Sequence, residues 1–507
     1  MIHKVKSRVY RIFKGSFRYT WLGSAGEKLF RRVQVLKYKK QREKELPTAE
    51  DLKKQRATRF SYAPMISIIV PLYCTPSEYL EELFESIQGQ SYENWELCLS
   101  DGSGEPQLLK ETLEKYLRDD RIKLLVSEQA LNISTNTNRA LTLATGEYIA
   151  FVDHDDKLAP DALYECVKAI NQNPEAEVFY SDEDKVLANG KDYLQPYVKP
   201  DFDLFLLRSI NYICHLFVVK AELLQRVGGL REEFDGAQDY DLILRCVELA
   251  KEVCHIPKNL YHWRIHPRST AGNPKSKAYF SSAGARAVTE HYERVGIQGI
   301  ATEGEYPGLY RTVFDWDKQP LISIIFLQEP KGIQKEAERT IQSVKSQSYK
   351  NIQWIESLVS YNEGAKEAKG EFLLFLNRRV TFLHTTGIQE LLGVSMCPGV
   401  GAVCGRIYDE KGKVLYAGLE VDSLGNVSST FSGRDSRDTG PFYSMVSTRS
   451  VDAVPVEGLM VRRESFERVR GFDETLRGLE IGRDFTRRLK EEGYLVLYHP
   501  YGELTLT

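Results

Sequence analysis

The sequence predicts an α/β fold that occurs twice in tandem, each copy a mostly parallel sheet flanked by helices. The first observation is that apolar, strand-like runs alternate with helical segments from residue 65 onward. The second is an internal repeat, in which Ile322-Ser-Ile-Ile matches Ile66-Ser-Ile-Ile. The third is the length of 507 residues, which allows two or three domains of ordinary size.

A strongly basic segment precedes the first copy. Residues 1–60 carry 18 Lys or Arg and 5 Asp or Glu, although the whole chain has a formal net charge of −3. Bulky groups at near-helical spacing (Phe13, Phe17 and Trp21) are mixed with basic residues, which is typical of an interfacial helix. The pattern has two equally good interpretations. Residues 1–45 contact an anionic membrane surface, or they form a helix that packs on the body of the protein. Residues 37–60 are expected to be a linker or a solvated helix.

Two further observations bear on the compartment. The eight cysteines include no Cys-x-x-Cys pair and mostly lie in apolar runs, so we expect buried free thiols in a reducing compartment. The chain contains no apolar run of membrane-spanning length and no signal-peptide pattern. We therefore expect a cytoplasmic protein, peripheral on the inner face of the membrane if the basic segment binds lipid. Nucleic acid is not an expected partner, because no recognised binding module is present.

Strands and helices alternate in order through the first copy. The carboxyl ends of parallel strands meet at one edge of a sheet, where ligands bind. We therefore expect polar residues that follow these strands to be functional. The predicted strands are 66–72, 95–100, 122–126 and 148–152, and the predicted helices are 77–89, 105–118, 134–144 and 239–250.

An acidic cluster follows the strand at 148–152. Asp153, Asp155 and Asp156 repel one another at the end of a buried strand, and a hard cation such as Mg²⁺ or Mn²⁺ relieves that repulsion. Such a cation keeps coordination sites for substrate phosphates, so the cluster predicts a metal–diphosphate site. The alternative is a polar loop that begins a helix near residues 158–163, which would account for Asp156 but not for the other two carboxylates.

The second copy lacks this cluster. Lys369-Gly-Glu-Phe-Leu-Leu-Phe-Leu-Asn matches Thr145-Gly-Glu-Tyr-Ile-Ala-Phe-Val-Asp, but it continues as Arg378-Arg379, which cannot hold a divalent cation. The segment before it is also shorter than in the first copy. The expected units are a basic helical segment and linker at 1–62, a catalytic domain at 63–300, a linker at 301–319 and a degenerate domain at 320–507.

Taken in order, these motifs and several others resemble glycosyltransferase family 2, whose members have the GT-A nucleotide-diphospho-sugar transferase fold. The resemblance is strong over about 65–300 and weaker over 320–507. The nearest subgroup comprises bacterial enzymes that build O-antigen, capsule or cell-wall polysaccharide. The motifs are Ile66-Ser-Ile-Ile-Val-Pro-Leu-Tyr, Gln90-Ser-Tyr-Glu-Asn-Trp-Glu-Leu, Asp153-His-Asp-Asp, Tyr180-Ser-Asp-Glu-Asp-Lys, Asn211-Tyr-Ile-Cys-His, Gln238-Asp-Tyr-Asp-Leu and Ile256-Pro-Lys-Asn-Leu-Tyr-His-Trp-Arg.

The resemblance implies a role for particular residues. It implies Asp239 as the catalytic base, Asp155, Asp153 and His266 as ligands of Mn²⁺ or Mg²⁺, and Asp101, Asp153, Arg264 and Arg268 as contacts of the nucleotide-sugar. Asp182, Asp184, Gln238 and Asp241 are expected near the sugar or acceptor.

Each role has a plain alternative. Asp101 could be a turn residue, Asp239 and Asp241 helix caps, and His266 a surface-loop residue. The acidic run 182–184 could be a solvated turn, and His215 is expected to be a core histidine on an apolar strand.

The function implied is inverting, metal-dependent transfer from a nucleotide-diphospho-sugar to a lipid-linked saccharide acceptor. The second domain would position the acceptor, or would assemble homo-oligomers or recruit a partner transferase. The alternative is a non-catalytic polysaccharide-binding or scaffold protein. A Walker-type NTPase is excluded because there is no Gly-Lys-Ser/Thr loop, and a sugar nucleotidyltransferase is disfavoured because Cys74-Thr-Pro-Ser stands where its Gly-rich loop would be.

Overall fold

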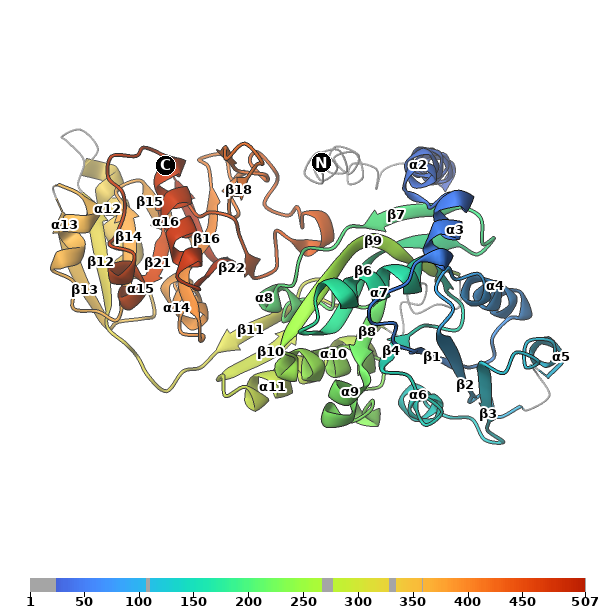
Figure 1. Cartoon of the computed structure of the whole chain (residues 1–507). Coiled ribbons are helices and arrows are strands. Elements are labelled where there is room, and N and C mark those ends of the chain that lie inside the picture. The colour runs from blue at the N-terminus through green and yellow to red at the C-terminus, as the bar shows by residue number, and fades with distance from the viewer. Residues whose placement is uncertain (1–23, 106–109, 267–276, 328–333, 358, 507) are drawn as a thin grey trace.

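The computed structural model describes residues 24–105, 110–266, 277–327, 334–357 and 359–506, which form two α/β units at opposite ends of the molecule (Figure 1). Each unit is built on its own nine-stranded sheet with helices packed against it. The predicted α/β class and its tandem repetition are therefore confirmed.

The first sheet has the order β3-β2-β1-β4-β8-β6-β9-β5, with β7 paired to β6. β3, β2, β1 and β4 run parallel, as predicted, whereas β8 is antiparallel to both of its neighbours, so the sheet as a whole is mixed. The strands are β1 (Ile66–Leu72), β2 (Trp95–Asp101), β3 (Ile122–Val126), β4 (Tyr148–Phe151), β5 (Lys157–Leu158), β6 (Ala176–Leu187), β7 (Tyr193–Tyr197), β8 (Phe217–Lys220) and β9 (Glu252–Ile265).

Hydrophobic clusters cover both faces of this sheet. Ile68 and Ile69 are neighbours on β1 but belong to different clusters, because successive side chains of a strand point to opposite faces. One cluster includes α4 and α7, and the other includes α9, α10 and α11. The helices are α4 (Ser77–Gln88), α5 (Lys110–Glu114), α6 (Ile133–Leu141), α7 (Ala162–Gln172), α8 (Leu204–Leu207), α9 (Ala221–Val227), α10 (Gln238–Leu249) and α11 (Lys277–Arg294), with a 3₁₀ turn η2 (Glu232–Phe234).

The second sheet repeats the topology of the first. Its order, β13-β12-β14-β21-β16-β22-β15, matches β2-β1-β4-β8-β6-β9-β5, and no described strand takes the place of β3. The strands are β12 (Ile322–Leu327), β13 (Ile352–Ser357), β14 (Phe372–Asn377), β15 (Val380–Phe382), β16 (Val400–Tyr408), β17 (Val414–Tyr416), β20 (Arg449–Ser450), β21 (Leu459–Arg462) and β22 (Leu495–Leu506), and a separate pair is formed by β18 (Glu420–Val421) and β19 (Val427–Ser428). The helices are α12 (Gln334–Lys345), α13 (Tyr361–Lys366), α14 (Gly387–Ser395), α15 (Arg463–Arg468) and α16 (Leu479–Glu491), with a 3₁₀ turn η4 (Pro441–Tyr443).

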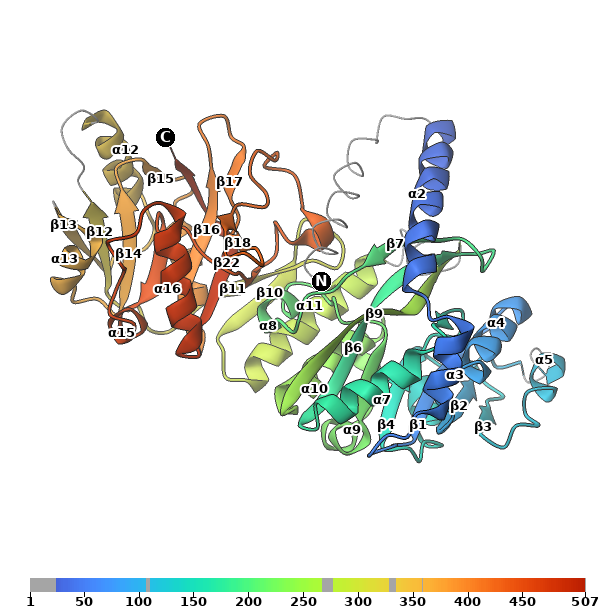
Figure 2. The same ribbon diagram turned by 45° about the horizontal axis from the view of Figure 1, so that its top comes forward.

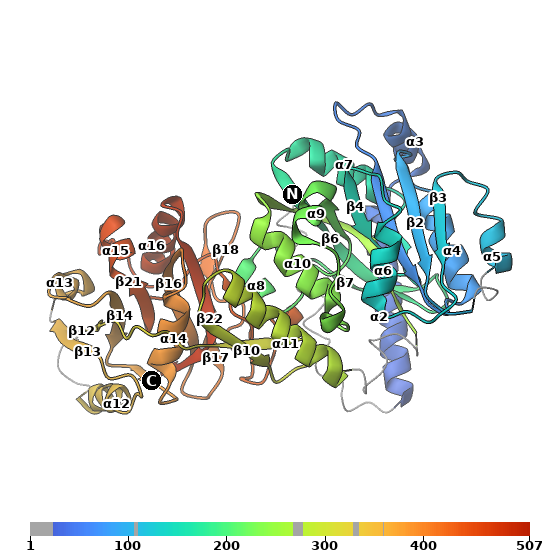
Figure 3. The same ribbon diagram turned by 90° about the horizontal axis from the view of Figure 1, so that it is seen from below.

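A hairpin joins the two units where a linker was expected at 301–319. β10 (Gly299–Glu303) and β11 (Tyr310–Phe314) pair antiparallel and lie between the two sheets (Figure 3). Tyr310 is buried, and the hydrophobic cluster that contains it includes residues of both domains. The connection is therefore packed and not an open tether.

The basic segment ends in two helices, α2 (Ser24–Glu45) and α3 (Ala49–Ala57). The carboxyl-terminal half of α2 packs on β7 (Figure 2), where Tyr38 is buried and the Arg42 guanidinium lies 3.5 Å from the centre of the Tyr193 ring. The helix α3 has no buried residue, so the solvated-helix alternative holds there. Phe13, Phe17 and Trp21 lie outside the described residues.

None of the helices in the described part of the chain is long and apolar enough to cross a lipid bilayer. All eight cysteines are free, as expected, and five of them are buried. Cys214 and Cys254 are only partly buried, and Cys74 is exposed.

Candidate active site

The acidic run lies where the carboxyl ends of β1, β2 and β4 meet. Leu72 pairs with Asp101 at the end of β2, and Asp153 follows β4 by two residues. The Asp101 carboxylate is buried and accepts hydrogen bonds from the Ser103 amide (3.0 Å) and hydroxyl (2.5 Å). Asp101 therefore shapes the turn after β2, and it does so at the sheet edge where a nucleotide contact was expected.

Asp156 fastens the acidic loop to the end of β9. Its carboxylate is fully buried and accepts hydrogen bonds from the Tyr261 hydroxyl (2.5 Å) and the Arg264 amide (2.6 Å). The Tyr261 oxygen in turn accepts from the Asp153 amide (3.1 Å). Burial, reinforced by the neighbouring Asp155 and Asp153 charges, raises the pKa of Asp156 well above its usual value.

Asp155 and His266 come together as predicted. The His266 Nε2 atom lies 2.7 Å from Asp155 Oδ2. Arg264 holds this arrangement, because its Nε donates to the Asp155 carbonyl (2.5 Å) and its Nη2 donates to Glu82 (2.8 Å). Arg264 is fully buried and stacks over Tyr79, so the structure places it as a brace of the loop and not as the open phosphate contact that was expected.

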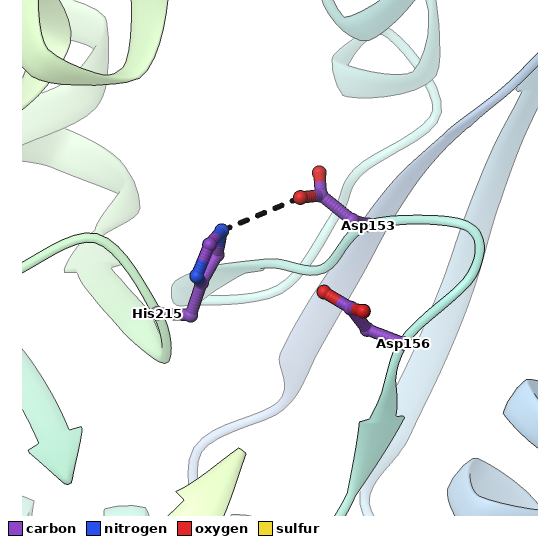
Figure 4. Close-up of side chains that lie close together, drawn as sticks. All are labelled: Asp153, Asp156 and His215. Atoms are coloured by element: carbon purple, nitrogen blue, oxygen red, sulfur yellow. Dashed lines mark ion pairs between the residues drawn. The ribbon is translucent and has the colours of Figure 1, made fainter. Parts of the chain in front are cut away.

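Asp153 faces His215, which was expected to be a core histidine. His215 Nε2 lies 3.3 Å from Asp153 Oδ2 (Figure 4). His215 Nδ1 lies 3.6 Å from Glu183 Oε2. His215 precedes β8 and lines a cavity, so the expectation of a core strand histidine was wrong. Burial disfavours its charged form, but Cys214, Asp153 and Glu183 outweigh burial and hold the pKa of His215 well above its usual value.

Asp239 shares that cavity. A space of about 90 Å³ is lined by Asp153, His215, Gln238 and Asp239 among other residues. Asp239 is the second residue of α10, and its Oδ2 accepts a hydrogen bond from the Asn211 amide group (3.0 Å). Burial raises the pKa of Asp239, although the charge of His215 partly opposes the rise. A carboxylate on α10 therefore lies beside the acidic loop that follows β4.

Three of the expected sugar or acceptor contacts are engaged by protein groups. Asp182 and Asp184 lie on the strand β6, not on a turn. Asp182 is bonded to His255 (2.8 Å), and Asp184 is bonded to Tyr38 (2.6 Å) and His262 (2.6 Å).

Asp241 is fully buried against Arg231 (2.5 Å) and Arg245 (2.7 Å), so this structure does not present it to a ligand. Gln238 lines the small cavity, where its Oε1 accepts from the Gly236 amide (2.8 Å). Arg268 lies outside the described residues.

The corresponding edge of the second sheet has no acidic cluster among its described residues. β14 ends at Asn377, whose Oδ1 accepts from the Arg379 amide (3.0 Å), and β15 pairs with β22 as β5 pairs with β9. The loop after this strand thus carries carboxylates in the first domain, whereas the second domain has an asparagine followed by two arginines.

Sequence reasoning assigned His215 to the core instead of the site, and it missed the structural part played by Asp156. Both residues belong to motifs quoted above, Asn211-Tyr-Ile-Cys-His and Asp153-His-Asp-Asp. The motifs pointed to these positions, but they did not predict the role of either residue. Ligand atoms of Asp153, Asp156 and His215 all lie within 4.8 Å of one another, and the Asp155–His266 pair adjoins them. The carboxylates of Asp153 and Asp155 and the imidazoles of His215 and His266 are donors of the kinds that bind a divalent cation, whereas both oxygens of Asp156 are engaged by the protein.

Comparisons with known proteins relate part of the first domain to a known family. The family model described as glycosyl transferase family 2 matches residues 67–226. The chain is 31% identical over 488 residues to the uncharacterized protein y4gI of Sinorhizobium fredii, which covers 88% of this chain and 53% of that protein. It is 30% identical over 476 residues to the O-antigen biosynthesis protein RfbC of Myxococcus xanthus, covering 87% of this chain and 37% of that protein.

Among solved structures, the chain is similar to S. aureus TarS 1–349 in complex with UDP, with a TM-score of 0.34, 21% identity, and coverage of 45% of this chain and 72% of that chain. The match spans only about half of the length of y4gI and little more than a third of the length of RfbC. The first domain thus has an α/β fold and matches the glycosyl transferase family 2 model over residues 67–226, and a second sheet-containing domain follows it.

We expect Mn²⁺ to raise the melting temperature of the intact protein and expect Asp155→Asn to abolish most of the rise. At a concentration about 100 times Kd, a ligand stabilises the folded state by about 2.7 kcal/mol. Thermal unfolding with and without Mn²⁺ measures this shift. Asp120→Asn, which alters an exposed carboxylate of the same domain, is the matched control and should keep the full shift. Equal shifts in wild type and Asp155→Asn would contradict the assignment.

Proposed function

We propose that the first domain is an inverting, metal-dependent glycosyltransferase that moves a sugar from a nucleotide-diphospho-sugar to a saccharide acceptor in bacterial surface polysaccharide synthesis. The observation that carries this proposal is that one cavity is lined by both Asp153 and Asp239. The family match and the O-antigen biosynthesis relative support the reaction class and the pathway. The non-catalytic scaffold is the competing function, and retention of both carboxylates in the first copy argues against it.

The donor belongs at the carboxyl ends of β2 and β4. Parallel α/β sheets bind nucleotides at this edge, and Asp101 and Asp153 mark it here. Asp155, Asp153 and His266 would hold Mn²⁺ or Mg²⁺, with His215 beside them. A bound cation would stabilise the negative charge that develops on the diphosphate as the glycosidic bond breaks. Arg264 and Glu82 keep the loop in place and need not touch the donor.

The acceptor belongs on the Asp239 side of the cavity. The Asp239 carboxylate takes the proton of the acceptor hydroxyl while that oxygen forms the new bond to the anomeric carbon. The bond from the anomeric carbon to the diphosphate oxygen breaks on the opposite face, so the configuration inverts. The hydrogen bond from Asn211 fixes one carboxylate oxygen of Asp239 and leaves the other for the proton. A raised pKa suits a base that must accept a proton near neutral pH.

The basic segment is proposed to bring the protein to an anionic membrane, where a lipid-linked acceptor would be found. The helix α2 also packs on the first domain, where Tyr38 donates a hydrogen bond to the buried Asp184 carboxylate and Arg42 forms an ion pair with it. Membrane contact is therefore assigned to the residues before α2, at the cytoplasmic face. The second domain is proposed to position the acceptor, and assembly of homo-oligomers or with a partner transferase remains a second use of it.

Replacing Asp239 by Asn should lower the rate of sugar transfer by about 10²- to 10⁴-fold, because the base is removed while the shape is kept. Release of nucleoside diphosphate and formation of glycoside, measured over a panel of nucleotide-sugars with Mn²⁺, give the rate. Asp484→Asn is the matched control, since Asp484 lies on α16, the corresponding helix of the second domain, and pairs with Arg487 and Arg488. Unchanged transfer by Asp239→Asn would refute the assignment of the base.

The pH profile of kcat/KM should fall on the acid side at a pH above the usual pKa of an aspartate, about 3.9. Burial raises the pKa of Asp239, so the carboxylate becomes protonated, and the base is lost, as pH falls through that raised value. Rates measured between acid and neutral pH, with recovery of activity on return to neutral pH, separate titration from unfolding. An acid limb at or below the ordinary aspartate value would contradict this reasoning.

Deletion of residues 1–23 should release the protein from anionic liposomes and spare transfer to a soluble acceptor. Each basic residue near anionic lipid contributes about 1 kcal/mol of attraction. This deletion keeps Tyr38 and Arg42, whereas deletion of residues 1–45 would also strip partners from Asp184. Cosedimentation with phosphatidylserine vesicles, against neutral phosphatidylcholine vesicles as control, measures binding. Equal sedimentation of the full and shortened chains would end the membrane proposal.

A further inference from the structure

A larger cavity opens on the other side of Asp239, at the junction of the two domains. It has a volume of about 430 Å³, and Asp239 and Asn211 lie in its wall. Volumes of this order suit small-molecule ligands. Six aromatic rings line it: Tyr197, Tyr240, Trp263, Tyr310, Phe442 and Tyr443. The last two belong to η4 of the second domain, so the domain that lacks the acidic cluster contributes directly to a cavity beside the proposed base.

Ring contacts seat η4 on the first domain. Phe442 stacks on Tyr197 with ring centres 3.7 Å apart and planes 15° from parallel. The ring of Tyr443 lies 5.5 Å from that of Tyr306, which belongs to the loop between β10 and β11. The loop that carries η4 reaches from the second sheet toward β7 (Figure 2). Phe442 nevertheless keeps 37% of its surface exposed.

Hydrogen bonds fix the far end of the same loop. The Ser450 amide donates to Asp203 Oδ2 (2.7 Å), while Asp203 Oδ1 accepts from the first amides of α8. The Thr448 amide donates to the Ser209 hydroxyl (3.2 Å). The two rings of η4 are therefore held at set positions on the first domain.

The backbone of η4 is unusual for bulky residues. Phe442 and Tyr443 have φ angles of +50° and +60°, in the left-handed region that favours glycine. Two consecutive aromatic residues in this region cost conformational energy that the surrounding contacts must offset. Such conformations cluster at sites that bind ligands.

The chemistry of the cavity suits a sugar ring. A hexopyranose presents an apolar C–H face, which packs on aromatic rings, and a rim of hydroxyl groups, which need donors and acceptors. Asp239, Asn211, Gln195 and Lys185 line the same space and supply those polar partners. Asn211 and Asp239 already share one hydrogen bond, and a purely apolar ligand would leave the remaining donors and acceptors of these groups without a partner from the ligand.

We infer that Phe442 and Tyr443 form the second-domain wall of a binding site for the acceptor hexopyranose, with its reactive hydroxyl facing Asp239. The inference rests on the proposed function, and it gives the second domain a defined task in acceptor binding. Donor binding lies at the opposite side of the Asp239 carboxylate and does not involve η4. Loss of the wall should therefore weaken acceptor binding and leave donor turnover unchanged.

The test uses the intact protein, with Phe442→Ala and Tyr443→Ala as variants. Binding of methyl α- and β-hexopyranosides of glucose, galactose and mannose is measured by saturation-transfer NMR in the presence of UDP and Mn²⁺. Hydrolysis of UDP-glucose, UDP-N-acetylglucosamine and GDP-mannose without acceptor is measured in parallel. Each variant should weaken hexoside binding at least tenfold and change donor hydrolysis less than twofold. Tyr494→Ala, which alters an aromatic residue of the second domain outside the cavity, should change neither.

Three results would overturn the inference: no hexoside bound by the wild type, equal binding by wild type and the η4 variants, or a parallel loss of donor hydrolysis in those variants. Failure of the proposed function is recognised separately. Asp239→Asn should lose transfer, and that result tests the proposed base independently of the η4 variants. If the wild type turns over no donor, the transferase proposal fails, while the binding measurements still decide whether η4 forms a sugar-binding wall.

Discussion

A buried carboxylate, Asp156, fixes the position of the acidic loop at the carboxyl edge of the first sheet. With no water available, its two oxygens must find donors within the protein, and they find the Tyr261 hydroxyl and the Arg264 amide. That requirement ties the loop after β4 to the end of β9, although about a hundred residues separate them. Asp155 then faces His266, and Asp153 faces His215. Buried Asp156 thus positions Asp153 and Asp155, the carboxylates that a ligand can reach.

Comparison of the two domains separates fold from chemistry. Both sheets follow the same strand order apart from β3. β4 in the first sheet and β14 in the second take the same place, next to the parallel strands β1 and β12. Asn377 and Arg379 replace the carboxylates without disturbing that topology. The strand order therefore depends on the buried apolar faces, while the polar residues at the edge were free to change. The second domain keeps a contact with the first through η4, β20 and the hairpin, where its rings meet the cavity beside Asp239.

Much of the fold could be predicted from local patterns. The strands at β1 to β4 and the helices between them follow from apolar runs and helical spacing, and the tandem repeat follows from matched segments. Other features could not be predicted, because they depend on contacts distant in sequence. The expected linker at 301–319 contains a packed hairpin, and the expected acidic turn at 182–184 is part of a strand whose carboxylates bind Tyr38, His262 and His255.

The sequence by itself determined the class of chemistry. Three aspartates after an apolar strand, present in one copy and absent from the other, predict that any catalysis belongs to the first domain. Only the tertiary structure decided what each carboxylate does. In the sequence, Asp156 is not distinguishable from Asp155, nor Asp241 from Asp239. In the structure, Asp156 is buried against Tyr261, and Asp241 is buried against Arg231 and Arg245, so both have structural roles. The role of a carboxylate depends on which donors surround it, and those donors come from strands and helices that the chain brings together only on folding.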